Sequence, residues 1–282
     1  MVTIPISAAA DTKTLPLSRG ELFAGLLLLG CANGLFGRAI QSVHRLGWTD
    51  AAVSTFDISV IVLGACFAGL SLLLSDRTGD VRSADLAVAA AVLLMIALPI
   101  GAASWLAITM LSLYILHLGQ PSDAQRRGAM ILFAMTVPML WSRLIFDLFA
   151  KFILSVDAAL VGWVLGTHRA GNMVEFADHS GTLAIFPACS SLANVSLALL
   201  CWVTVSQSLQ HKWRPQDIFW CALTCSSVVA VNVIRISLMG VSPSYYRMLH
   251  DPFAEGVVGM VMLTLIVGIS LLGVRRDAIF RI

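Results

Sequence analysis

The sequence predicts an all-α fold, a polytopic bundle of about eight transmembrane helices, and composition gives the first two reasons. Of the 282 residues, 58% are hydrophobic and only 12% are charged, about half the charged share of an average soluble domain. A soluble surface needs more polar area than this chain contains. The composition therefore excludes an ordinary soluble enzyme and a disordered chain. The net charge of +2 gives no reason to expect nucleic acid as a partner.

The third reason is the recurrence of apolar stretches close to the length of a membrane span, which is about 20 helical residues. Eight stretches are expected to span, and they run over approximately Glu21–Gly37, Asp57–Ser75, Ala84–Gly101, Trp105–Gly119, Gly128–Phe149, Pro187–Leu209, Asp217–Gly240 and Glu255–Val274. The third and fourth could instead form one broken helix. The first could be a signal peptide, although Glu21 interrupts its step from basic to apolar residues.

Basic residues predict the orientation of these spans, because cytoplasmic connections carry an excess of Lys and Arg. Three short connections each contain a pair, namely Arg77 and Arg82, Arg126 and Arg127, and Lys212 and Arg214. Arg19 precedes the first span. We therefore expect both ends of the chain on the cytoplasmic side.

The longest outer connection follows the fifth span, over about Lys151–Phe186. Its first part, Phe152–Leu165, is apolar but too short to span, and it predicts an amphipathic interfacial helix with Trp163 at headgroup depth. Alternating residues over Thr182–Phe186 predict a short extended segment before Pro187.

Polar features of interest are concentrated in the second half of the chain. We therefore divide the sequence into an N-terminal four-span region, residues 1–129, and a region over residues 130–282 that is expected to carry the site. Neither an internal repeat nor a soluble domain is evident from the sequence.

The first candidate is Cys189, which is expected in the first turn of the sixth span because Pro187 suits the start of a helix. The N-terminus of a helix favours a thiolate, and its free N–H groups could hold an oxyanion beside the sulfur. The alternative is an unreactive thiol packed between helices.

The second and third candidates are Arg235 and His250, near the outer ends of the next two spans. Asn232 lies one helical turn before Arg235 and makes a polar patch with it. Imidazole gains and loses a proton near neutral pH, and Asp251 or Glu255 could orient the ring of His250. A snorkelling arginine and an idle loop histidine are the alternatives.

A thiol, a guanidinium and an imidazole at the outer ends of three consecutive spans match the needs of thiol acyl transfer: a nucleophile, a charge stabiliser and an acid/base. Consecutive spans with short connections are expected to be neighbours.

The motifs that carry these residues resemble the exosortase/archaeosortase family of membrane transpeptidases. The family's Cys-Ser-Gly, Asn-x-x-Arg-Ile and following His correspond to Cys189–Ser191, Asn232–Ile236 and His250. The resemblance extends from about Met130 to the end. Ser191 stands where the family usually has Gly, which puts the shape of the substrate groove in doubt.

The resemblance implies that Cys189 is the nucleophile, Arg235 the stabiliser and His250 the acid/base, although Arg235 could instead hold substrate carbonyls. The residues expected to bind or support the substrate are Ser190, Asn194, Asn232 and Asp251.

The resemblance also implies a cysteine protease or transpeptidase that needs neither metal nor cofactor. Its partners would be the lipid bilayer and membrane-anchored proteins whose C-terminal sorting signal comprises a short motif, one transmembrane helix and a basic end. Its place would be the inner membrane of a Gram-negative bacterium that exports exopolysaccharide, with the active site on the outer side.

The main alternative is a polytopic transporter or permease, which would predict charged sites near the membrane midplane and often two related halves. A structural subunit is a further alternative. Four outer-connection residues, His168, Glu175, Asp178 and His179, could bind a metal.

Overall fold

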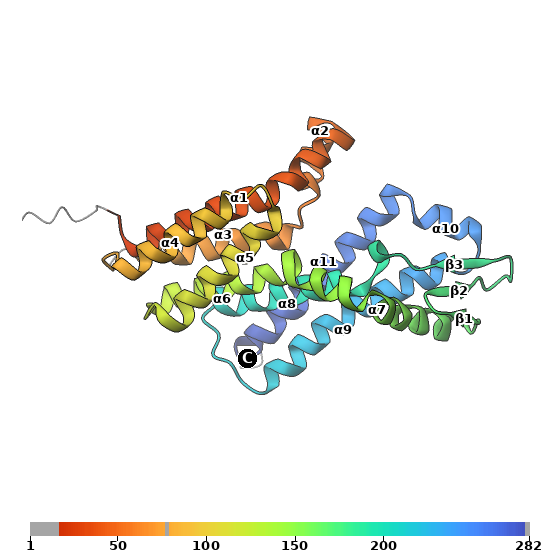
Figure 1. Ribbon diagram of the computed structural model, residues 1–282. Coiled ribbons are helices and arrows are strands. Elements are labelled where there is room, and N and C mark those ends of the chain that lie inside the picture. The colour runs from red at the N-terminus through yellow and green to blue at the C-terminus, as the bar shows by residue number, and fades with distance from the viewer. Residues whose placement is uncertain (1–16, 77–78, 280–282) are drawn as a thin grey trace, which may run out of the picture.

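The chain folds as a bundle of helices with one small sheet (Figure 1). The computed structural model describes residues 17–76 and 79–279, so Arg77 lies outside the described residues. The α-helices are α1 (Arg19–Leu46), α2 (Trp48–Val53), α3 (Val60–Leu74), α4 (Ser83–Ile96), α5 (Gly101–Leu113), α6 (Asp123–Thr136), α7 (Ser142–Leu165), α8 (Ser191–Ser208), α9 (Gln216–Met239), α10 (Pro243–Leu249) and α11 (Pro252–Ile279). Single helical turns of 3-10 or π type are η1 (Thr55–Asp57), η2 (Tyr114–Leu118), η3 (Val137–Trp141) and η4 (Pro187–Cys189), and the strands are β1 (Arg169–Ala170), β2 (Met173–Glu175) and β3 (Thr182–Ala184).

In the described part of the chain, five helical segments are long and apolar enough to cross a membrane: Arg19–Leu46, Gly101–Leu118, Ser191–Ser208, Gln216–Met239 and Phe253–Arg275. They correspond to the first, fourth, sixth, seventh and eighth predicted spans. The second and third predicted spans form the shorter apolar helices α3 and α4. Because α4 ends at Ile96 and α5 begins at Gly101, and the two helices pack together, they form a hairpin of separate helices and not one broken helix.

The fifth predicted span, Gly128–Phe149, is shared between α6, η3 and α7. Pro138 lies inside η3 and has no N–H group to donate, which fits the wider spacing of a π turn. The backbone bends again at Phe149, and α7 then continues to Leu165. The predicted helix over Phe152–Leu165 is therefore present, but as a continuation of α7.

Three short antiparallel strands in the order β1-β2-β3 form the sheet. Strand β3 confirms the predicted extended segment, since Thr182 is exposed while Leu183 and Ile185 are buried. The sheet lies beside the end of α7 and leads the chain back to the start of α8 (Figure 1).

Two clusters of buried apolar side chains hold these elements together. The larger cluster joins α1 and the following helices to α8, with Leu27, Leu132 and Leu200 among its members, so it contains residues from both regions of the sequence. The smaller cluster lies between α7, the sheet and α9.

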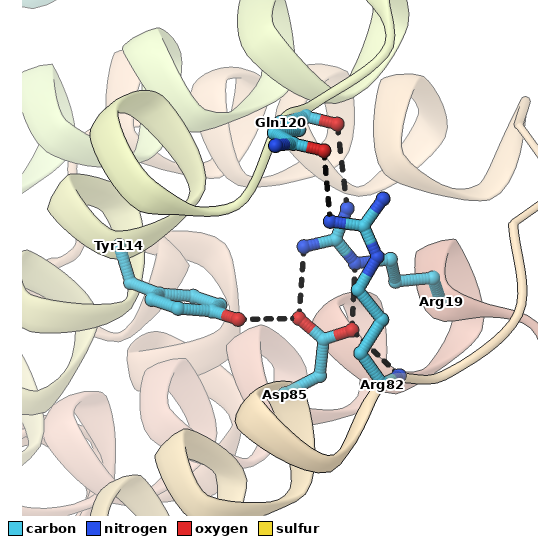
Figure 2. A network of polar contacts seen from close by, with 5 residues as sticks. All are labelled: Arg19, Arg82, Asp85, Tyr114 and Gln120. Carbon is cyan, nitrogen blue, oxygen red and sulfur yellow. Dashed lines mark hydrogen bonds and ion pairs between the residues drawn. The ribbon is translucent and has the colours of Figure 1, made fainter.

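A buried ion pair fastens the starts of α1 and α4 (Figure 2). The Nε and Nη2 atoms of Arg19 each lie 2.8 Å from one carboxylate oxygen of Asp85, which makes the pair bidentate. The Tyr114 hydroxyl donates to the same carboxylate at 2.7 Å, and the N–H of Arg82 donates at 2.9 Å. Arg19 and Asp85 are 4% and 0% exposed. The sequence predicted Arg19 only as a basic residue beside the first span. In the structure it is buried and joins α1 to α4 through its ion pair with Asp85.

Candidate active site

The thiol segment connects the sheet to α8. Pro187–Cys189 forms a single 3-10 turn, and α8 begins at Ser191. Cys189 therefore precedes the helix, which corrects its predicted position in the first turn. The physical reason is the N-cap, because the Ser190 hydroxyl, and not the turn at Pro187, caps α8 by accepting the N–H of Leu192 at 3.3 Å.

The backbone N–H groups around the thiol already have acceptors. Those of Cys189 and Ser190 donate to the carbonyls of Phe186 and Pro187, and that of Ser191 donates to a carboxylate oxygen of Asp157 at 3.2 Å. The expectation that free N–H groups at the start of this helix would hold an oxyanion is therefore wrong for these groups. Another donor must take this role in any acyl-transfer reaction.

Asn232 connects the thiol segment to α9. Its side chain is buried, and its Nδ2 donates to the carbonyl of Cys189 at 2.8 Å and to the hydroxyl of Ser191 at 3.0 Å. Ser191, the departure from the motif of the resembled family, thus supplies one of the two acceptors of this amide. A Gly at this position would remove that hydrogen bond.

Asp157 supports the same segment from α7 and was not singled out from the sequence. It is 3% exposed and accepts the N–H of Ser191 at the start of α8, where the helix dipole favours a negative charge. A sequence signal was present, because Asp157 is the one ionisable residue within the apolar stretch Phe152–Leu165 and such a residue usually has a partner.

Arg235, Glu255 and His250 form a second polar group. The Nη2 of Arg235 lies 2.9 Å from Oε1 of Glu255, and Nδ1 of His250 lies 3.6 Å from the same oxygen. The imidazole also stacks on the ring of Tyr246, with 5.3 Å between the ring centroids. The Nε of Arg235 is buried and donates to no group among the described residues.

Helix α9 brings these two groups to one end of the packed helices α8, α9 and α11. Asn232 and Arg235 are three residues apart, which on a helix places their Cβ atoms about 5–6 Å from each other. Asn232 contacts the Cys189 segment while Arg235 contacts Glu255. Within residues 17–76 and 79–279, no hydrogen bond or ion pair joins Cys189 directly to Arg235 or to His250.

The other residues predicted to support the substrate differ in their contacts. Asp251 does not orient His250, since its carboxylate accepts the N–H of Phe253 at 3.1 Å and so caps the start of α11. Asn194 is half-buried on α8 and makes no side-chain hydrogen bond within the part of the chain that the structure describes. Glu255, the alternative partner, is the carboxylate next to the imidazole.

The polar connection between α7 and α8 does not gather metal ligands among the described residues. His179 contacts Glu175 at 2.9 Å, and this hydrogen bond lowers the pKa of the Glu175 carboxyl. Among the described residues, no group of three or more His, Cys, Asp or Glu side chains is placed to hold a metal ion.

No family model, curated protein or solved structure matches the chain. The described residues offer a half-buried thiol, a guanidinium with a free Nε–H, and an imidazole beside a carboxylate. This set suits nucleophilic attack on a carbonyl group followed by proton transfer.

The Asn232 contacts lead to a first prediction. Replacing Asn232 by alanine should lower the free energy of unfolding by about 1–3 kcal/mol, because the carbonyl of Cys189 and the hydroxyl of Ser191 lose a buried donor. The same change should speed maleimide labelling of Cys189, since its loop loses its attachment to α9. Unfolding in detergent and labelling followed by mass spectrometry measure the two effects. Ser191→Ala, which removes one acceptor only, should have the smaller effect on both, and equal effects would contradict this account.

Proposed function

We propose that the chain is a membrane-embedded cysteine protease or transpeptidase of the exosortase/archaeosortase type, which cleaves C-terminal sorting tails through a thioester on Cys189. The observation that carries the proposal is the bond from Asn232 to the carbonyl of Cys189. It links the two motif segments that are 43 residues apart, and it leaves Arg235 one turn along the same helix. Glu255 then connects Arg235 to His250.

In this proposal the chain has eight spans, with both ends in the cytoplasm and the site on the outer face of the inner membrane. The short connections rich in Lys and Arg support that orientation. Helices α3 and α4, of 15 and 14 residues, rise only about 22 and 21 Å. As spans they require a locally thinner bilayer than the usual hydrocarbon core of about 30 Å. The second half of α7, with Trp163 exposed, would lie along the interface.

The proposed reaction begins when the Cys189 thiol passes its proton to His250 and the thiolate attacks the scissile carbonyl carbon. A C–S bond forms, and the carbonyl oxygen becomes an oxyanion. The C–N bond then breaks as the His250 imidazolium returns the proton to the leaving amine, leaving a thioester on Cys189. An amine or hydroxyl acceptor resolves the thioester in transpeptidation, and water resolves it in hydrolysis.

Arg235 is the preferred donor to the oxyanion. The N–H groups of residues 189–191 already donate elsewhere, whereas Nε of Arg235 is buried and has no acceptor among the described residues. A preorganised donor that forms its bond only when charge develops lowers the barrier most. Glu255 holds Nη2 of the same guanidinium and so fixes its plane.

Replacing Arg235 by lysine tests the proposal, because lysine keeps the charge but loses Nε and the planar fork. We expect tail cleavage to fall at least about 100-fold, the usual cost of losing one oxyanion donor. The full chain would be co-expressed with tailed proteins from the same genome, and cleavage would be followed by the change in mass of the tailed protein.

The matched control is Arg169→Lys, which changes an exposed arginine of β1 and should leave cleavage unchanged. Tailed proteins that are never cleaved by the unaltered chain would contradict the proposed function. Full activity of Arg235→Lys would contradict only the role given to Arg235.

The transporter alternative gains little support from the buried ion pair. Arg19 is the first residue of α1, and Asp85 is the third residue of α4. The pair therefore lies at helix ends, where a flank is expected, and not near the middle of a span, where a transported substrate would bind.

A further inference from the structure

A pocket of about 760 Å³ lies where α1 passes the α4–α5 hairpin and the η3–α7 junction. Its wall is partly apolar, with Trp105, Met139 and Leu140, and partly polar, with Arg38, Gln41 and Arg143. None of these residues belongs to the proposed catalytic group. The pocket is thus a separate feature that the proposed function does not explain.

The hollow arises from the shortness of α4. A helix of 14 residues rises about 21 Å, so the α4–α5 hairpin stops well before the end of the 28-residue α1. At the floor of the pocket α1 and α5 approach closely, because a Cβ atom at Gly34 would lie only 2.8 Å from the Trp105 ring. The small residue permits this contact, as in many membrane helix pairs.

The position of Arg38 along α1 places the pocket near the membrane interface. Arg19 begins the helix, and a helix rises about 29 Å between residues 19 and 38, close to the thickness of the hydrocarbon core. If Arg19 lies at one interface, Arg38 therefore lies at the other. In that placement Arg38 lies at the level of the lipid phosphate groups.

The charges that line the pocket are not balanced within the protein. Neither the side chain of Arg38 nor that of Arg143 makes a hydrogen bond or an ion pair within residues 17–76 and 79–279. Arg143 is exposed, and Asp147, the one acidic residue of the lining, is also exposed and pairs with neither. The lining thus carries two guanidiniums and one carboxylate without an ionic partner among the described residues.

We propose that this pocket binds an aminophospholipid, with its phosphodiester between Arg38 and Arg143 and its ammonium group at Asp147. Each charged group of the headgroup then has a partner of opposite sign, since the phosphodiester lies between two guanidiniums and the ammonium group meets a carboxylate. The acyl chains would lie on Met139 and Leu140, and Trp105 has the amphipathic ring that is common at headgroup depth. Guanidinium pairs favour phosphate oxygens through charge-assisted hydrogen bonds.

The lipid site and the thiol segment are neighbours. A smaller pocket of about 280 Å³ shares Arg143 and Asp147 with the first one and is also lined by Pro187 and Ser190, on either side of Cys189. A lipid bound at Arg143 would therefore form one side of the space next to the Cys189 loop. The binding itself needs no reaction at Cys189, so its test does not depend on the proposed function.

The test is lipid binding by the full chain after delipidation in detergent, followed by native mass spectrometry during titration with phosphatidylethanolamine. The double change Arg38→Gln and Arg143→Gln should weaken binding at least about tenfold, because charge-assisted bonds to phosphate are lost. Asp147→Asn should remove the preference for phosphatidylethanolamine over phosphatidylglycerol. Thermal unfolding checks that each variant is folded.

The matched control is Arg45→Gln with Arg169→Gln, which removes the same charge from two exposed arginines outside the pocket and should leave the affinity unchanged. Three results would overturn the proposal. The first is unchanged lipid affinity in the pocket variant, and the second is an equal loss of affinity in the control. The third is displacement of the lipid by soluble glycerophosphoethanolamine at equal concentration, which would indicate a site for a free phosphodiester and not for a lipid.

Discussion

Replacing Cys189 by alanine should reduce tail cleavage at least about 1,000-fold, because loss of a covalent nucleophile leaves only binding and charge stabilisation. The thioester offers a second readout that activity alone does not give. In the unaltered chain, hydroxylamine should release an acyl group from Cys189 during turnover, and peptide mass spectrometry should locate it there. The alanine variant should show neither cleavage nor acyl group.

The matched control for this change is Cys221→Ala. Cys221 is also a free, half-buried cysteine, but it lies on α9 far along the helix from Asn232. The change Cys221→Ala should leave tail cleavage and the acylation of Cys189 unchanged. Cleavage that survives in Cys189→Ala would contradict the cysteine mechanism, because the chain would then process tails by another route.

Replacing Asp85 by alanine should lower the free energy of unfolding by about 3–5 kcal/mol, the usual cost of leaving one member of a buried ion pair without its partner. Arg19 would keep its charge while 4% exposed, with both of its close bonds to the carboxylate lost. Unfolding of the purified chain in detergent measures the change. Tyr114→Phe, which removes one neutral donor from the same carboxylate, should cost about 1 kcal/mol.

A double variant separates charge from packing at this site. Changing Arg19 to Met and Asp85 to Leu together removes both charges and keeps side chains of similar size, so most of the lost stability should return. If the double variant were as unstable as Asp85→Ala, the packing of α1 on α4 and not the unpaired charge would explain the loss.

The long helices could be predicted because each extends over a continuous apolar stretch, and the strand Thr182–Ala184 because its side chains alternate. Asn232 and Arg235 lie near the end of α9, and His250 lies shortly before α11. Their position at the same end of the bundle could therefore be predicted from their order along the chain. The start of α8 does not follow from the sequence, since both Pro187 and Ser190 are residues that begin helices. Only the folded chain shows which of them acts as the cap.

Contacts between distant segments could not be predicted from one sequence. Asp157 binds a backbone group 34 residues away, and no local pattern determines which carboxylate reaches a helix start. The Arg19–Asp85 pair joins residues 66 apart, so Arg19 was indistinguishable from other basic flanks. The pocket beside Arg38 depends on where α4 stops relative to α1, which is a property of helix packing.

The two separate apolar clusters differ in size, and so in the number of buried contacts that hold each of them together. Cys189 packs against the smaller cluster, together with Tyr246, whereas α8 contributes Leu200 to the larger one. Elements with fewer buried contacts open at lower free energy than the core of the same protein. The thiol therefore lies where the two clusters meet. In the proposed reaction, local opening of the smaller cluster would make room for an extended peptide beside Cys189 while the larger cluster stays packed.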